Sequence, residues 1–350
     1  MSASIGDEDL DAAIAAGILT PETASRLRAY VEQRRAAPVA DEEQFRLLTG
    51  FNDIFVSIAV LLVLIALAWL GGRIAQWFGA ALVAVACWGL AEFFTARRRM
   101  ALPSILLLLG WVGGVSVVSL LTISGATQLE PGGPRLALSA LAAGAAAYAH
   151  WLRFKVPITV AAGTGAVLGL LILIASTTIP GGFRLILPLI FLSGLCLFGL
   201  ALWWDMSDPG RRTRRADVAF WLHLSAAPLL VHPAFSWLGL ASAPWELATA
   251  PPSSGAVDFS RPALAVAIYL LLALVALLID RRALMVSALA YVLYAMNAFF
   301  RGTGDLTISL ALSALIAGAA LLLLSAYWRP ARRGLLKLTP KWFRARLPAA

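Results

Sequence analysis

The chain has 350 residues, of which 60% are hydrophobic and only 13% are charged, and its mean hydropathy is +0.83. This composition excludes an ordinary soluble globular domain and predicts an all-α, polytopic integral membrane protein. The net charge of +9 does not indicate nucleic acid as a partner, because the basic residues lie between apolar segments and not in one basic region. The expected partner is the lipid bilayer.

Residues 1–50 form an acidic segment ahead of the apolar part of the chain. They include nine acidic residues and five arginines, for a net charge of −4. Apolar residues recur at helical spacing in the first half: Leu10, Ile14 and Ile18. Gly17 can end that helix, and Thr20-Pro21 is typical of the N-cap and first position of a second helix, which we expect to extend to about Arg35. The segment is therefore predicted to be a small cytosolic helical hairpin with a linker.

Part of this hairpin carries a recognisable pattern: Gly17-Ile18-Leu19-Thr20-Pro21-Glu22, then Ala24, Leu27 and Val31. Together with the many apolar segments behind it, this pattern resembles the N-terminal hairpin of uncharacterised bacterial polytopic inner-membrane proteins grouped as domains of unknown function. The resemblance implies a class of membrane protein. It implies no catalytic residues.

Residues 51–70 are the first segment that can cross a membrane. No charge occurs from Ile54 until Arg73, and at about 1.5 Å per residue this length suffices for a hydrocarbon core. Asn52 and Asp53 suit the N-cap and first turn of the helix, which accounts for them without a further role. No cleavable signal peptide is expected, so this segment should act as the first, uncleaved insertion signal.

Nine further apolar segments predict that residues 51–328 form a bundle of about ten transmembrane helices. They lie near residues 77–95, 101–124, 136–152, 156–176, 185–204, 217–240, 263–279, 283–300 and 307–328. Ten spans place both ends of the chain on one side of the membrane.

The distribution of lysine and arginine predicts which side this is. Of the 28 basic residues, 23 lie in the two terminal segments and one set of alternate connections, and five lie in the other set. Basic residues are enriched on the cytoplasmic side, so we expect both termini in the cytoplasm. The resemblance to bacterial inner-membrane proteins implies that this membrane is the inner membrane of a bacterial cell. A single missed or added span would exchange the downstream connections and remove this bias.

A weak repeat accompanies the basic connections. Even-numbered spans end in aromatic and basic residues, and the next span often has an early proline, as at Pro103 and Pro157. The pattern indicates either a duplicated helical hairpin or the ordinary recurrence of interfacial aromatics and first-turn prolines in multispan proteins.

Small residues predict close helix packing in two spans, through Gly110 with Gly114 and Gly165 with Gly169. The two cysteines, Cys87 and Cys196, lack any paired spacing and are expected to be small buried hydrophobic residues.

Residues 329–350 are predicted to be a basic cytosolic tail. Within the tail, residues 339–344 look like a short amphipathic helix, with Trp342 and Phe343 among cations. Such a helix suits a membrane surface that carries anionic lipid. The alternative is a solvated segment that only anchors the topology.

Ionisable groups inside a membrane are costly and are therefore candidates for function. Glu92 lies near the inner end of the second span, within reach of the interface and the basic residues 97–99, and His150 is expected at the interface. His223 and His232 lie nine positions apart in the seventh span, close to half a turn out of phase, so they do not form one metal site on a straight helix. We expect no metal and no cofactor.

One candidate ligand site is predicted in the outer half of the bundle, where two prolines can bend the seventh span and free backbone carbonyls. Its expected residues are His232, Asn297, Arg301 and Trp237. Asn297 and Arg301 share a helix face, so an anion or polar head group would find both charge and hydrogen bonds there. The alternative is that Arg301 pairs with Asp305 and His232 caps freed carbonyls.

The sequence contains no motif that predicts catalysis: no metalloprotease histidine pair, no phosphate-binding glycine loop and no nucleophile with a base. We therefore expect a non-enzymatic integral membrane protein, acting as an envelope scaffold or sensor. The alternative is a carrier or flippase for a small polar or anionic substrate.

Overall fold

The computed structural model describes residues 7–27, 51–124, 134–208, 210, 211, 213–238, 260–282, 284, 285, 289, 292, 293, 296 and 306–340. The chain divides into two compact units, Met1–Phe45 and Arg46–Ala350. Each unit is described by itself.

The first unit contains helix α1 (Asp7–Ala15), which is followed by a turn at Ala16 and Gly17. Gly17 adopts a φ of +71°, a conformation that glycine tolerates without cost, and its amide donates to Ile14 O at 3.0 Å. Residues 21–27 are helical again. Thr20 caps this turn, because the Thr23 amide donates to Thr20 Oγ1 at 3.2 Å. The predicted continuation to residue 35 lies outside the described residues.

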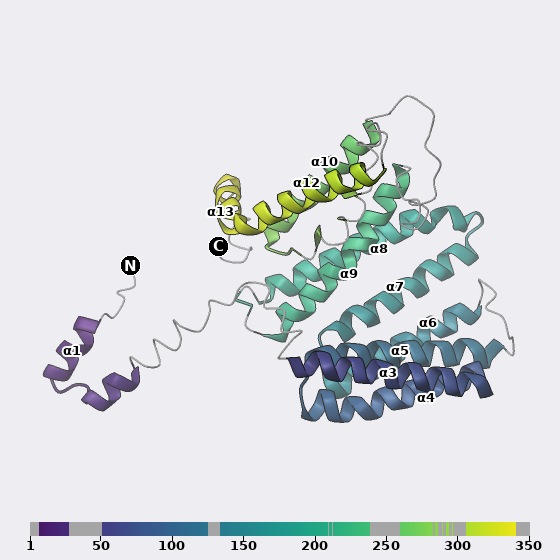
Figure 1. The fold of residues 1–350 in the computed structure, drawn as a ribbon, viewed down its shortest axis with the longest axis horizontal. Coiled ribbons are helices and arrows are strands. Elements are labelled where there is room, and N and C mark those ends of the chain that lie inside the picture. The colour runs from purple at the N-terminus through teal and green to yellow at the C-terminus, as the bar shows by residue number, and fades with distance from the viewer. Residues whose placement is uncertain are drawn as a thin grey trace. The chain divides into compact units, whose positions relative to one another are not determined.

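The described residues of the second unit form helices that are joined by short turns (Figure 1). Its elements are α3 (Phe51–Ile74), α4 (Gln76–Ala91), the π-helix η1 (Glu92–Arg97), α5 (Ala101–Ser124), α6 (Pro134–Phe154), α7 (Ile158–Thr178), the 3-10 turn η2 (Gly182–Leu185), α8 (Ile186–Met206), α9 (Arg214–Trp237), α10 (Ser260–Ile279), α12 (Leu306–Ala326) and α13 (Trp328–Leu338).

Six helical stretches are long and apolar enough to cross a membrane: α3, α4 with η1, α5, α7, α8 and α9. A seventh is added if the bent pair α12 and α13 is one span, and the apolar part of α10 is shorter. Helix α6 is not among them, because it is rich in alanine and carries an arginine near each end. The expected total of ten therefore exceeds what the described residues show, and residues 286–288 and 297–300 of the expected ninth span lie outside them.

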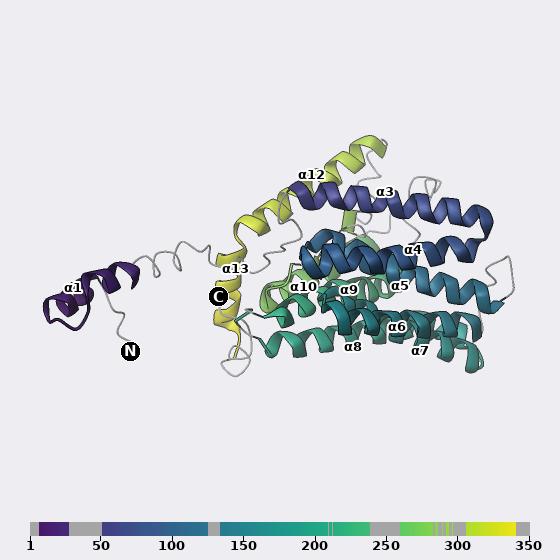
Figure 2. The same ribbon diagram turned by 90° about the horizontal axis from the view of Figure 1, so that it is seen from below.

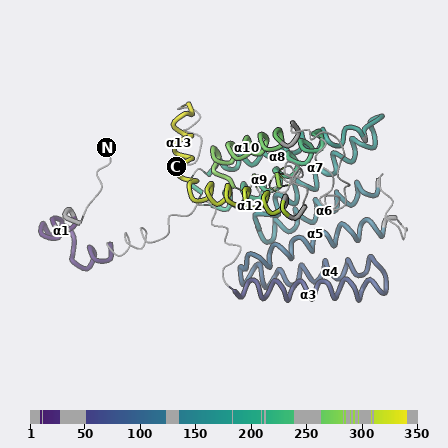
Figure 3. The backbone as a smooth tube through the Cα atoms, turned by 45° about the horizontal axis from the view of Figure 1, so that its top comes forward, coloured from purple at the N-terminus to yellow at the C-terminus, as the bar shows by residue number. Residues whose placement is uncertain are grey.

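Consecutive helices of this unit pack against one another from α3 to α7, and α8 and α9 form a tight pair (Figure 3). Helix α9 also contacts α7 and α10. Half of its most apolar stretch is buried, against at most 28% in the other five spans. It is therefore the most enclosed of the candidate spans, and the others expose the apolar surface that a lipid environment requires.

The two predicted glycine pairs differ in the structure. A methyl group at Gly110 would collide with Cys87 Sγ, and one at Gly114 would lie 2.9 Å from Ala80 O, so α4 and α5 approach closely there, as predicted. Gly165 and Gly169 have no such neighbour within 4 Å, so for that pair the prediction is wrong. Cys87 is buried as expected, whereas Cys196 is exposed.

Helix α9 is continuous through both of its prolines, Pro228 and Pro233. Proline has no amide hydrogen, so Pro233 leaves the carbonyl of Leu229 without its helical donor. A methyl group at Gly194 of α8 would lie 2.9 Å from the carbonyl carbon of Leu229. Gly194 thus allows α8 to approach the backbone of α9 at this point.

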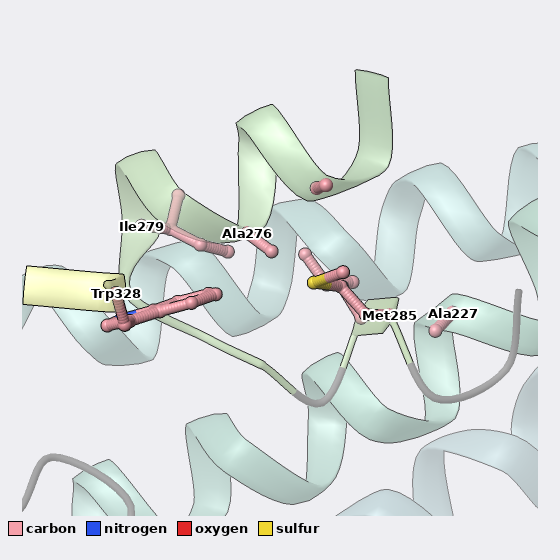
Figure 4. Packing of buried hydrophobic residues seen from close by; sticks show 7 residues of the cluster. Ala227, Ala276, Ile279, Met285 and Trp328 are labelled. Atoms are coloured by element: carbon pink, nitrogen blue, oxygen red, sulfur yellow. The ribbon is translucent and has the colours of Figure 1, made fainter. Parts of the chain in front are cut away.

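The last helices are joined by a sharp corner at Tyr327. Residues 311–326 and 328–338 are bent by 72° from one another (Figure 2). Trp328, the first residue of α13, packs with Ala276 and Ile279 of α10, in a cluster that also includes Ala227 of α9 (Figure 4). Residues 329–338, predicted as the start of a tail, therefore belong to a helix that contacts the bundle.

Candidate functional site

Among the described residues, the largest group of buried charges lies near the ends of four helices. It joins the last turn of α8, the first half of α9, the end of α10 and the beginning of α13. Its members are Asp205, Arg211, His223, Asp280, Arg281, Trp328 and Arg332, which we call the charge network. All of them are buried or nearly so: the Arg211 side chain is 11% exposed, and each of the other residues is at most 7% exposed.

The first half of the network is centred on the carboxylate of Asp205. The Arg281 guanidinium contacts both of its oxygens, through Nη2 to Oδ1 and through Nε to Oδ2 at 3.2 Å. Arg281 Nη2 also donates to the carbonyl of Ala216 at 3.1 Å, in the first turn of α9. His223 Nε2 lies 2.9 Å from Oδ2 of Asp205. Two oxygens thus join three segments of the chain.

The second half is centred on the carboxylate of Asp280. Arg211 Nη1 donates to Oδ2 at 3.0 Å, and the Trp328 indole donates to Oδ1 at 2.7 Å. Arg332 forms an ion pair with the same carboxylate, with Nε 3.8 Å from Oδ1. The guanidinium of Arg282 stacks over the Trp328 ring, 4.9 Å from its centroid. Asp280 therefore attaches α13 and the α8–α9 turn to the end of α10.

Local backbone geometry explains why adjacent residues serve both halves. Asp280 has a φ of +58°, in the left-handed region that ends many helices, and the Arg281 amide donates to Ala276 O at 2.9 Å. Arg211 Nη2 donates to the carbonyls of Ile279 and Asp280, at 3.0 Å each, which completes the end of α10.

Apart from His223, the charged groups of the network are three arginines and two aspartates, which together carry a net charge of +1. Burying an ion without a partner costs several kcal/mol or more, and the network avoids this by hydrogen-bonding each carboxylate to at least two donors. His223 Nε2 faces the Asp205 carboxylate, and an ionised carboxylate only accepts hydrogen bonds, so Nε2 carries a hydrogen and donates it. In a neutral ring the other nitrogen, Nδ1, then carries the lone pair. Nδ1 has no hydrogen-bond partner among the described residues.

The backbone conformation of Arg211 and Asp280 recurs at equivalent connections. Among the described non-glycine residues, positive φ occurs at Arg99, Lys155, Arg211 and Asp280, each just after an even-numbered predicted span. The first three follow one another at equal intervals. A left-handed residue ends many helices, so this conformation is compatible with both explanations of the sequence repeat.

A smaller polar group lies at the end of α6. Glu92, in the π-helix, accepts two hydrogen bonds from Arg153, at 2.9 and 2.6 Å. Its described partner is thus Arg153 of α6, and not the basic residues 97–99 that the sequence suggested. His150 is completely buried between helices, with Nδ1 3.2 Å from Thr159 Oγ1, and it lies in the last turns of α6; its expected depth at the interface stays a prediction. The ring of Phe154 lies 4.6 Å from that of His150.

The predicted ligand site is represented only in part. His232 is exposed, and Trp237 is 54% exposed with its ring 5.3 Å from Phe191. Asn297 and Arg301 lie outside the described residues, so their expected grouping with His232 stays a prediction. Of the predicted polar residues, His223 belongs to the charge network and Glu92 to the smaller group.

Sequence reasoning missed most of the network. Arg211, Arg281 and Arg332 were interpreted as basic residues that orient the chain, and Asp205 and Asp280 were not singled out. The available signal was an aspartate at the end of each of two long apolar helices, after Trp204 and after Ile279. An acid at a helix C-terminus opposes the helix dipole and therefore indicates a nearby cation.

The fold and this site define an all-helical chain with several helices that can cross a membrane and a buried charge network at their ends. No family model, curated protein or solved structure matches the chain. Among the described residues, no group of histidine, cysteine, aspartate and glutamate is arranged to hold a metal ion.

Proposed function

We propose that the chain is a non-enzymatic protein of the bacterial inner membrane that acts as an envelope scaffold or sensor. The proposal includes ten membrane spans, cytoplasmic termini and membership of the uncharacterised bacterial class that the N-terminal hairpin resembles. The observation that carries it is the charge network, in which the buried charges between helices are bound to one another.

The network supports a structural role because its groups bridge helices that are distant in the sequence. Asp205 and Arg281 connect α8 to the end of α10, and Asp280 connects α10 to Trp328 of α13. A carrier that used these charges would need them to exchange partners during its cycle. If either carboxylate moved away from its partners, buried arginines would lose their counter-ion, which is costly. This cost favours one fixed arrangement of the network.

The cytoplasmic placement of the network is supported by the distribution of basic residues. Arg211, Arg281 and Arg332 belong to the large basic set, and they are held in ion pairs. When these three arginines are left out of the count, the large set still contains most of the other basic residues of the chain. The proposed orientation therefore does not depend on the three arginines that the network uses.

An enzymatic role finds less support. Asp205 and His223 form an acid and histidine pair, but the second nitrogen of the ring contacts no nucleophile among the described residues. Such a pair orients a base only when a hydroxyl or thiol lies within hydrogen-bond reach.

The test is a flux measurement on the purified full-length chain in vesicles of phosphatidylcholine with 30% phosphatidylglycerol. Proton flux would be followed with an enclosed pH-sensitive dye, and lipid translocation with a fluorescent phospholipid and an external quencher. A scaffold gives the rates of protein-free vesicles. Flux above that background that is lost in Asp205→Asn, with the variant still inserted in the vesicles, would overturn the proposal in favour of a carrier or flippase.

A further inference from the structure

Helix α13 has three faces of different chemistry. Trp328, Arg332 and Leu336 are buried, each one helical turn after the last. The next stripe around the helix contains only basic residues, all exposed: Arg329, Arg333 and Lys337. The opposite flank is apolar and includes Leu338, which is 84% exposed. Residues four positions apart share a face, so each stripe runs along the whole helix.

The corner before α13 directs the helix away from the axis of a membrane-spanning segment. Residues 328–338 are turned by 72° relative to residues 311–326. If α12 crosses the bilayer, as its composition suggests, a turn of this size places α13 close to the membrane plane. Tyr327 at the corner is 61% exposed, and tyrosine is enriched where the hydrocarbon meets water.

The charge network fixes the rotation of α13 about its own axis. The Trp328 indole donates to Asp280, and Arg332 pairs with the same carboxylate. With this face held against α10, the basic stripe and the apolar flank lie on opposite sides of the contact. A helix with one basic and one apolar side at the bilayer surface is the arrangement that binds lipid head groups.

We propose that Arg329, Arg333 and Lys337 bind the phosphates of anionic phospholipids in the leaflet beside α13. The three side chains are exposed and lie along about 12 Å of the helix, from a rise of about 1.5 Å per residue, and α13 itself contains no acidic residue. A zwitterionic lipid carries no net charge to match them. The inference rests on the proposed membrane insertion, and it concerns α13 and not the short amphipathic helix expected at residues 339–344, of which residues 341–344 lie outside the described residues.

The experiment measures lipid selectivity of the full chain in phosphatidylcholine vesicles that contain spin-labelled phosphatidylglycerol or spin-labelled phosphatidylcholine. The fraction of immobilised label gives the relative association constant of each lipid. The stripe variant is R329Q/R333Q/K337Q. The control is R97Q/R214Q/R215Q, which removes three exposed basic residues from the same predicted side of the membrane.

The wild type and the control are expected to prefer phosphatidylglycerol. Each basic residue near a membrane surface is worth about fivefold, so Arg333→Gln lowers the preference by about that factor and the stripe variant by tenfold or more. Equal selectivity of the stripe variant and wild type, or equal losses in stripe variant and control, would overturn the inference. So would complete competition by inorganic phosphate, which would indicate a site for free anions.

Failure of the wider proposal gives a different result. A chain that does not float with vesicles on a density gradient is not inserted, and the proposed membrane role fails with it. A chain that floats but shows no preference for phosphatidylglycerol contradicts only the lipid site.

Discussion

The whole of α9 and α10 lies between Asp205 and Arg281 in the chain, yet the Arg281 guanidinium binds both carboxylate oxygens of Asp205 in a buried position. This contact joins the end of α8 to the end of α10. His223 adds a third element from α9. The ends of these helices are therefore held by polar contacts at a point where hydrophobic packing alone would leave their relative positions less defined.

His223 should stabilise the network through its Nε2 hydrogen and not through its bulk. His223→Gln keeps an amide donor near the position of Nε2, whereas His223→Leu removes it and leaves Asp205 with one donor fewer. We expect His223→Leu to lose about 1 to 3 kcal/mol more than His223→Gln, the usual cost of leaving a buried polar group unpaired. The free energy of unfolding of both variants is measured by titration with sodium dodecyl sulfate, with circular dichroism as the signal. Equal losses would show that the contact with Asp205 contributes little.

The close approach of α8 and α9 at Gly194 predicts a large effect of one methyl group. Gly194→Ala would place its Cβ 2.9 Å from the carbonyl carbon of Leu229, and backbone does not give way as a flexible side chain does. The expected loss in free energy of unfolding is about 1 to 3 kcal/mol. Gly199→Ala on the same helix is the control, because nothing lies within 4 Å of its new Cβ. A loss at Gly199 as large as at Gly194 would contradict this packing.

The Trp328 indole hydrogen is one of the contacts that attach α13 to the end of α10. Trp328→Phe preserves an aromatic ring against Ile279 but removes the donor to Asp280. A hydrogen bond to a charged group contributes about 1.5 to 3 kcal/mol, so the variant should unfold at lower detergent and be cut faster by protease after α12. Trp203→Phe, at an exposed position of α8, should behave as wild type. Unchanged protease sensitivity of Trp328→Phe would contradict the attachment.

The proposed topology predicts which introduced cysteines react in intact cells. In a chain with Cys87→Ala and Cys196→Ala, Ser253→Cys should react with a membrane-impermeant thiol reagent added outside. Ser207→Cys, in the α8–α9 turn, should react only after permeabilisation. We propose a cytoplasmic N-terminus and six spans before position 207, which places this position in the cytoplasm. Labelling of position 207 in intact cells would contradict that topology.

Hydropathy predicted the helices better than it predicted their contacts. Residues 101–124 were expected as one span, and α5 has the same limits. For α9 the prediction began three residues late, because the Thr213 side chain accepts from the Arg215 amide and starts the helix at Arg214. Local patterns of this kind are legible because they depend on neighbouring residues.

The charge network depends on contacts between distant segments, and a single sequence does not reveal these. Arg211 and Arg281 look like other basic residues of the connections, and only their partners distinguish them. A basic residue that orients the chain and one that is buried in an ion pair have the same appearance in a single sequence. The aspartates after Trp204 and Ile279 were the informative residues, since an acid at the end of an apolar helix needs a cation nearby.

The central claim is that the charge network holds the ends of α8, α9 and α10 in one arrangement. A double-mutant cycle on Asp205 and Arg281 tests it most directly. The free energy of unfolding in sodium dodecyl sulfate would be measured for the wild type, Asp205→Asn, Arg281→Gln and the double variant. Each single change leaves a buried charge without its partner and should cost about 3 to 5 kcal/mol, whereas the double change removes both charges and should cost clearly less than the sum. Strictly additive losses, or single variants as stable as the wild type, would contradict the claim.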